Sequence, residues 1–196
     1  MLGSLLGGSV CQAGIVFNVT LDTSPLNGHP AGPFALDFQL TDGSGGGDGN
    51  NTAVVKNFNF HGGSWSGPAS VSLTDNAFWV DFSQGFTAGT SLSFTVSLTT
   101  SVDAGGTPDR FSFALLDASG GEIPTVGIAN EFLGVDLSSP NPTIESYYSD
   151  GSLTDIVIGA PGVTVVPEPQ STLGVALLCG LGALSLAGRR MQGSLR

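Results

Sequence analysis

The chain has 196 residues, which is room for one domain of roughly 150 residues with a buried core and for a segment at each end. Sixteen Asp and Glu stand against five Lys and Arg, giving a formal net charge of −11, and three of the five basic residues lie in the last eight positions. Such an acidic body repels phosphate backbones, so the composition argues against nucleic-acid binding.

Residues 1–13 resemble the end of a secretory signal peptide. A short apolar run ends in Cys11-Gln12-Ala13, a pattern that suits signal-peptidase cleavage after Ala13. The basic segment expected before the run is missing, so we expect an atypical signal or, preferably, a start upstream of Met1. Because Cys11 and Cys179 lie in the two terminal apolar segments, the central body has neither a disulfide framework nor thiol catalysis.

From residue 14 onward, apolar and polar residues alternate with a period of two, as in strands that bury one face. The alternation is clearest over residues 15–22 and 34–41. Further runs rich in β-forming residues follow, separated by turns of Gly, Asn, Asp, Ser and Pro. The expected strands cover residues 15–22, 34–41, 53–60, 70–74, 77–82, 91–100, 110–117, 132–137 and 152–159.

This succession of strands, with short turns and no helical repeats, predicts an all-β fold. We expect an antiparallel β-sandwich or jelly roll over residues 14–160, with Trp79 in its core. Residues 161–170 are rich in glycine and proline, which cannot continue a central strand. They are therefore expected to form the linker that ends the domain.

Signals of catalysis are weak. His29 and His61 lie in turns and lack the spacing of a zinc site. The segment GGSWSG comes nearest to a nucleophile elbow, but it does not place a serine at the required position. We expect no enzymatic activity, and a secreted hydrolase is only the third hypothesis.

The sharpest local feature of the body is the loop DGSGGGDGNN, residues 42–51. Asp42, Asp48 and Asn50, with backbone carbonyls, could supply the oxygen ligands that Ca²⁺ prefers, and the glycines permit a tight backbone. The loop lacks the glutamate that completes an EF-hand. A flexible hairpin loop is the commoner interpretation of such a segment, and a calcium site is the alternative.

Aromatic residues in turns are a second kind of candidate. Trp65, Tyr147 and Tyr148 lie in segments with the composition of exposed loops. An aromatic ring offers an apolar face to a sugar, and nearby Asp and Asn can bond its hydroxyls. These three residues are therefore possible glycan contacts, although packing within the fold is the commoner role for Trp65.

Residues 171–188 are a continuous stretch without charge. A helix of this length, about 27 Å, is just sufficient to cross a hydrocarbon layer of roughly 30 Å. A buried core helix would show a polar face, and this stretch has none. Arg189 and Arg190 follow directly, so we expect a transmembrane helix with residues 189–196 as a basic cytoplasmic tail and the body outside.

The segment from residue 166 to 190 resembles the PEP-CTERM sorting signal of Gram-negative bacteria. The resemblance lies in Pro167-Glu168-Pro169, the apolar span, and the pair Arg189-Arg190 near the C-terminus. It implies export by the secretion machinery, a transient stay in the inner membrane, and recognition by an exosortase, a membrane-embedded cysteine protease-like enzyme. Processing near the motif would then deliver the body to the cell surface or the medium.

The body itself resembles a group of uncharacterised PEP-CTERM proteins with one β-rich domain, through segments such as FNVTLDTSPL, FALDFQL and FSFALLD. Such proteins often accompany exopolysaccharide and biofilm genes. The resemblance implies a non-catalytic structural or adhesive role at the cell surface or in the extracellular matrix. A carbohydrate-binding module that acts on exopolysaccharide is the principal alternative.

Overall fold

The computed structural model describes residues 14–102, 106–127, 129–153 and 155–167. Within these ranges the chain is all-β, with two antiparallel sheets and a single turn of 3-10 helix at Ser24–Leu26. The strands belong to one compact unit that ends at Val166, and a second unit comprises Pro167–Arg196. We call residues 14–166 the β-body.

Sheet A has five strands in the order β11-β1-β7-β3-β5. Every neighbouring pair in it is antiparallel, and β1 pairs with β7 along its whole length. The strands are β1 (Gly14–Asp22), β3 (Thr52–Asn59), β5 (Ser70–Thr74), β7 (Ser91–Thr99) and β11 (Gly162–Val166).

Sheet B has six strands in the order β10-β9-β8-β2-β6-β4. Its pairings are also antiparallel, and β8 and β2 form its middle, with β2 also paired along its whole length with β6. The strands are β2 (Phe34–Thr41), β4 (Ser64–Trp65), β6 (Trp79–Thr87), β8 (Arg110–Leu116), β9 (Leu133–Asp136) and β10 (Ile144–Ser146).

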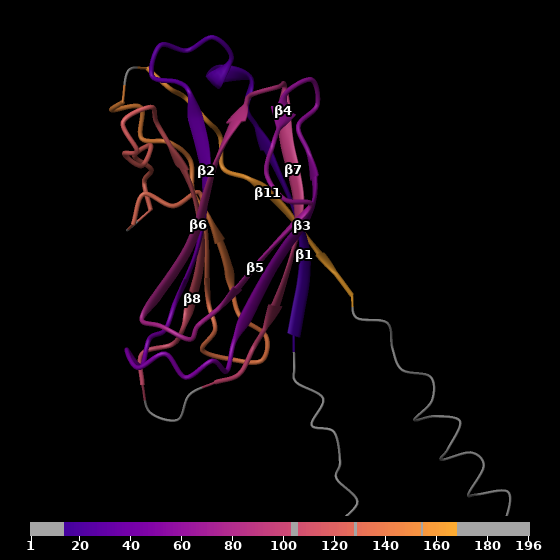
Figure 1. Cartoon of the computed structure of the whole chain (residues 1–196), viewed down its shortest axis with the longest axis vertical. Helices are drawn as coiled ribbons and strands as arrows, with labels where there is room; N and C mark the ends of the chain where they lie inside the picture. The colour runs from indigo at the N-terminus through magenta and orange to yellow at the C-terminus, as the bar shows by residue number, and fades with distance from the viewer. Residues whose placement is uncertain (1–13, 103–105, 128, 154, 168–196) are drawn as a thin grey trace, which may run out of the picture. The chain divides into compact units, whose positions relative to one another are not determined.

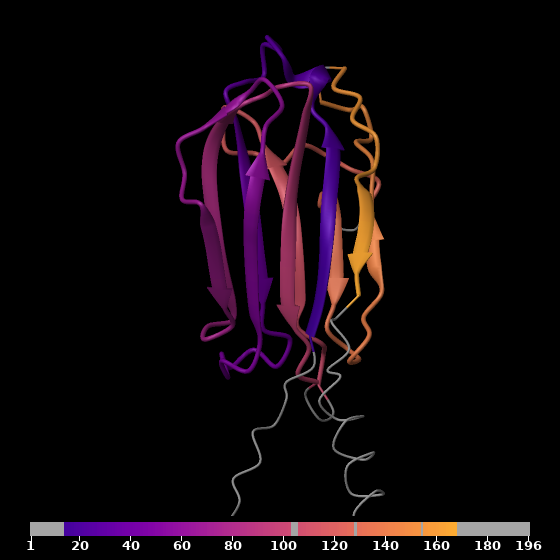
Figure 2. The same ribbon diagram turned by 90° about the vertical axis from the view of Figure 1, so that its right-hand side faces the viewer.

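The two sheets lie face to face and enclose a hydrophobic core (Figures 1 and 2). Phe38 of sheet B meets Phe94 of sheet A edge to face, with 5.4 Å between the ring centroids, and stacks on Phe113 at 5.2 Å. All three rings are buried, and burying a side chain of this kind stabilises the fold by about 1.5–3 kcal/mol. The apolar residues of the period-two alternation in both sheets therefore pack into one shared core.

One end of the β-body gathers the connections β2–β3, β5–β6, β7–β8 and β9–β10, and we call it the loop end. The strand register shows that these connections share one end. Thr41 of β2 lies opposite both Trp79 of β6 and Arg110 of β8, and Thr52 of β3 lies opposite Thr74 of β5. The start of β1 and the finish of β11 lie at this same end, which is the lower one in Figure 1. Segments far apart in sequence thus meet there.

The all-β prediction is confirmed, but some expected boundaries are wrong. Residues 162–166, expected in the linker, form the edge strand β11, because the prolines flanking it lie outside the paired residues and need no ladder bond. The run 152–159 is not a strand. Ile156 and Ile158 bury their side chains there while the Ser149 hydroxyl donates to the Ile156 carbonyl and accepts from the Ile158 N–H.

Trp79 was expected in the core, and this too is wrong. It shares the alternation phase of Asp81 and Ser83, which point outward from β6, and its side chain is 50% exposed. The inward positions of the strand are taken by Val80, Phe82 and Phe86 instead. The strand phase, set by its pairing with β2, overrides the preference of the indole for burial.

Several predictions concern residues outside those that the structure describes: the signal segment 1–13, the helix 171–188, the tail 189–196, and Glu168, Pro169, Arg189 and Arg190 of the sorting motif. Pro167 is the last described residue. Across the described ranges, no helix has the length and apolar character needed to cross a membrane.

Candidate functional site

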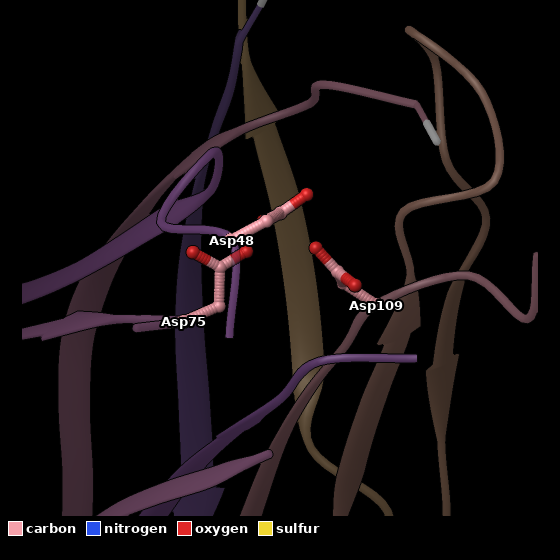
Figure 3. A group of neighbouring side chains, drawn as sticks. All are labelled: Asp48, Asp75 and Asp109. Carbon is pink, nitrogen blue, oxygen red and sulfur yellow. The ribbon is translucent and has the colours of Figure 1, made fainter. Parts of the chain in front are cut away.

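Three aspartates converge at the loop end. Asp48 lies in the β2–β3 connection, Asp75 directly follows β5, and Asp109 directly precedes β8. One carboxylate oxygen from each lies within 4.8 Å of the other two, and the side chains approach one another from three separate segments (Figure 3). Asp75 and Asp109 are buried, whereas Asp48 is exposed. We call these three residues the Asp triad.

Asn51 holds the two buried members of the triad in place. Its backbone N–H donates to both carboxylate oxygens of Asp75, at 3.1 and 3.0 Å, and its side-chain amide donates to Asp109 Oδ2 at 2.7 Å. The second oxygen of Asp109 accepts from the Gly43 N–H at 2.9 Å. Both carboxylates are therefore fixed by donors from the single connection between β2 and β3.

Asp42 organises that connection from inside. One of its carboxylate oxygens accepts from the Ser44 hydroxyl and the Gly45 N–H, and the other accepts from the N–H groups of Gly47 and Asp48. The side chain is fully buried. Because both oxygens point into their own loop, Asp42 shapes the backbone that carries Asp48 and does not belong to the triad.

At two glycines of the loop, Gly43 and Gly47, the neighbouring backbone leaves no room for a side chain. A Cβ on Gly43 would lie 2.1 Å from the Thr107 carbonyl oxygen, and a Cβ on Gly47 would lie 2.5 Å from the backbone of Asn76. Gly47 also has a φ of +71°, which side chains disfavour. The β2–β3 connection therefore packs directly against the backbone of the other two segments that carry the triad.

The carboxyl groups of the triad lie so close together that ionisation of one opposes ionisation of the next. Burial raises the pKa of Asp75 to about 7, and the neighbouring carboxyl of Asp109 adds to the rise. The hydroxyl of Ser44 lowers the pKa of Asp42, which stays ionised. Of the Lys and Arg side chains in the described ranges, neither Lys56 nor Arg110 pairs with the triad, since Arg110 bonds Glu131, Asp136 and Glu145.

A proton or a cation can relieve this repulsion. Oxygens bound to one Ca²⁺ at 2.3–2.6 Å lie at most about 5 Å apart, so the oxygens of the triad are close enough to share one ion. Ca²⁺ takes about 6–8 oxygen ligands, and backbone carbonyls and water would complete the set. The residues present thus fit a hard divalent cation better than a thiol- or imidazole-binding metal.

The calcium candidates from the sequence were Asp42, Asp48 and Asn50, and the structure brings one of them, Asp48, into the triad. Asn50 donates to Asp48 through its backbone N–H at 3.1 Å and its side-chain amide at 2.5 Å. Asp75 and Asp109 were missed, because each is a single acid at a strand boundary. Their signal was the shared end of their strands, which becomes visible only once the strand order is known.

Trp65, a proposed glycan contact, is largely enclosed by neighbouring groups. Its ring stacks on Phe58 and Phe60, with centroids 5.0 and 5.5 Å away, and the Gly67 backbone lies so close that a Cβ there would be 2.3 Å from the indole. The indole Nε1 donates to the Pro68 carbonyl. An open groove of about 540 Å³ borders the ring and is lined also by Asn57, Asn59 and His61.

Tyr147 and Tyr148 lie beyond the opposite edge of sheet B, because they follow β10 whereas Trp65 belongs to β4. The Tyr147 hydroxyl donates to Glu145, and its ring covers Gly127. Tyr148 is 55% exposed. The three aromatic candidates therefore do not form one common site.

Comparison of the chain with protein-family models, with curated proteins and with solved structures finds no significant match.

Proposed function

We propose that this chain is an exported, non-catalytic β-sandwich protein of the cell surface or extracellular matrix, and that Ca²⁺ fastens its loop end. The observation that carries the proposal is the convergence of Asp48, Asp75 and Asp109, with two of the three carboxylates buried. A cation at this point would neutralise their repulsion and tie together three connections that are otherwise joined by hydrogen bonds.

Such a site suits a protein that works outside the cell. Extracellular modules bind Ca²⁺ with dissociation constants of about 10⁻⁴ to 10⁻³ M, and we propose an affinity in this range for the Asp triad. Sites of that affinity stabilise a fold only where calcium is plentiful. The bound ion would then act as a structural clamp, with no chemical step assigned to it.

The position of the sorting motif supports export followed by processing. β11 is the last strand of sheet A and ends at Val166, and Pro167-Glu168-Pro169 follows at once. Cleavage by an exosortase near this motif would leave all of the described strands on the released body. The Pro-Glu-Pro motif therefore begins directly after the last residue of the folded unit.

Calcium binding is tested by the melting temperature of the metal-free protein with and without added Ca²⁺. We expect Ca²⁺ to raise the melting temperature of the parent protein and of Asp22→Asn, an exposed acid at the far end of β1. Asp75→Asn and Asp109→Asn should remove the response. If Ca²⁺ leaves the parent unchanged, the calcium clamp is ruled out.

Sorting is tested by the intact mass of the protein recovered from a culture supernatant of a bacterium that has an exosortase. A species that ends between Pro167 and Pro169 supports recognition and removal of the tail. A secreted species that retains Arg196 contradicts it. The result does not depend on calcium, so the two parts of the proposal are judged separately.

Carbohydrate binding is the second candidate function, and the groove beside Trp65 favours it. Its amide-bearing walls, Asn57 and Asn59, provide donors and acceptors for sugar hydroxyls. Binding on a glycan array that is lost in Asn59→Ala and kept in Tyr148→Ala would assign a sugar to this groove. The reverse pattern would move it to the exposed ring of Tyr148.

A further inference from the structure

Among the large apolar side chains that are exposed at the loop end, three lie in or beside its connections. Phe78 is 63% exposed, Trp79 is 50% exposed and Val102 is 49% exposed. Phe78 and Trp79 stand where β6 begins, and Val102 follows the end of β7. Single exposed apolar residues are ordinary, but these three lie at the end of the β-body where the chain also leaves it. We call these three residues the apolar tip.

Hydrogen bonds order the chain at or next to each residue of the apolar tip. The Phe78 carbonyl accepts from the Asp42 N–H at 2.9 Å, and the Trp79 indole donates to Gln39 Oε1 at 3.3 Å. The Ser101 N–H, one residue before Val102, donates to Asn51 Oδ1 at 2.8 Å. These bonds fix the backbone at Phe78 and beside Val102, and they hold the Trp79 ring against Gln39 of β2.

The chain leaves the β-body at this same end. Val166, the last residue of β11, lies opposite Val16, two residues from the start of β1. Ser171, the first residue of the uncharged stretch, is five peptide steps further along, and five steps span at most about 18 Å. If residues 171–188 cross a bilayer, the loop end cannot be far from its surface.

We propose that, before the tail is processed, the loop end rests on the outer surface of the membrane and the apolar tip inserts among the lipid headgroups. The proposal rests on the proposed sorting function, because it requires residues 171–188 in the bilayer. Indole rings favour the membrane interface, where one part of the ring is apolar and the N–H finds a polar partner. The β-body would then be oriented on the membrane as well as tethered to it.

The negative charge of the chain determines which lipid headgroups the loop end can approach. The loop end carries Asp48 and the buried acids beside it, and the chain as a whole has a net charge of −11. An anionic surface would repel it, so zwitterionic phosphatidylcholine is the matching probe. We expect contact with phosphatidylcholine vesicles to weaken when phosphatidylglycerol replaces part of the lipid.

The two tryptophans allow a direct test, because they lie at opposite ends of the β-body. Trp79 is at the loop end, and Trp65 pairs with Phe86 near the other end of β6. The full chain is reconstituted in phosphatidylcholine vesicles whose acyl chains carry bromine, a short-range quencher of indole fluorescence. Trp65→Phe reports on Trp79 alone, and Trp79→Phe reports on Trp65 alone.

We expect at least a twofold stronger quenching in Trp65→Phe than in Trp79→Phe, and Phe78→Ser should reduce it. Should Trp65→Phe not fold, the difference between the parent chain and Trp79→Phe measures the same quantity. Vesicle flotation separates the possible failures. A chain that floats with the vesicles while Trp79 stays unquenched overturns the membrane contact and leaves the sorting proposal standing.

If the chain does not float with the vesicles, residues 171–188 do not span the membrane, and the proposed membrane contact is overturned as well. A glycan is the other possible occupant of the apolar tip. A shift of Trp79 emission on adding a neutral polysaccharide such as dextran, with no quenching by the brominated vesicles, would assign the tip to a sugar and also overturn the proposal.

Discussion

Asn51 donates a hydrogen bond from its side-chain amide to the carboxylate of Asp109, with 2.7 Å between Nδ2 and Oδ2. Both residues are buried, and the bond joins the β2–β3 connection to the residue that precedes β8. The same amide also bonds the backbone of Ser101, as donor to its carbonyl and as acceptor from its N–H. The Asn51 side chain thus links the β2–β3 connection to both ends of the β7–β8 connection.

Replacing Asn51 with alanine should destabilise the β-body strongly. Asn51→Ala removes these side-chain bonds and leaves the buried carboxylate of Asp109 with one donor fewer, so we expect a loss of about 2–4 kcal/mol in the free energy of unfolding. Urea denaturation measures it. Asn141→Ala, in an exposed part of the β9–β10 connection, is the matched control and should change stability by less than about 0.5 kcal/mol.

Asp42 and Asp48 lie in one loop but should respond to substitution in different ways. Asp42→Ala removes the acceptor for four loop donors, so we expect a loss of about 2–3 kcal/mol whether or not Ca²⁺ is present. Asp48→Ala removes an exposed member of the triad, so metal-free stability should hardly change while the response to Ca²⁺ is lost. Thermal melts in EDTA and in Ca²⁺ separate the two effects, and identical behaviour of both variants would contradict these separate roles.

The raised pKa of Asp75 makes the stability of the metal-free protein depend on pH. The pKa is about 7 in the folded protein and about 4 in the unfolded chain, so between these values the folded state binds the extra proton. The free energy of unfolding should therefore fall as pH rises from about 4 to 7, with the stabilisation complete below that window.

Comparison with Asp75→Asn isolates this contribution. Urea denaturation of the metal-free proteins at pH 5 and pH 8 should show a steeper decline for the parent than for the variant. Burial also raises the pKa of Asp37, which leaves a residual slope of the same sign in both proteins. Added Ca²⁺ competes with the proton, so its stabilising effect should be larger at pH 8 than at pH 5. Equal slopes in parent and variant would refute the assignment to Asp75.

The fold class was predictable because most central strands are long enough to show their alternation. β1, β2 and β7 each bury every second residue, and this pattern survives without knowledge of the partners. β4 and β10 have only two and three residues, too few for a period to show. β11 was missed because its flanking prolines mimic a linker, and an edge strand tolerates them.

The Asp triad was only partly predictable, since its members are brought together by strand order. The glycine-rich loop marked Asp48, and the same local reasoning overestimated Asp42, whose carboxylate is used by its own loop. Asp75 and Asp109 have ordinary local surroundings in the sequence. They meet at one end because β5 leads directly into β6, and β6 and β8 both pair antiparallel with β2.

The ion pair between Arg110 and Glu131 should contribute more to stability than a surface pair. The guanidinium bonds both carboxylate oxygens of Glu131, and it reaches Asp136 at 2.5 Å and Glu145 at 3.2 Å. The side chain of Glu131 is only 2% exposed. Arg110 also lies across Gly134, where a Cβ would come within 2.1 Å of the guanidinium.

Removing the arginine would leave a buried carboxylate without its cation. We expect Arg110→Met to cost about 3–5 kcal/mol, and Arg110→Met combined with Glu131→Gln to recover part of that loss, because the second change removes the unpaired charge. Lys56→Met, at an exposed position in β3, is the control for loss of a cation. Chemical denaturation of the three variants measures the change in the free energy of unfolding that each causes. If Arg110→Met costs no more than Lys56→Met, the buried pair contributes little, and another interaction must stabilise this part of sheet B.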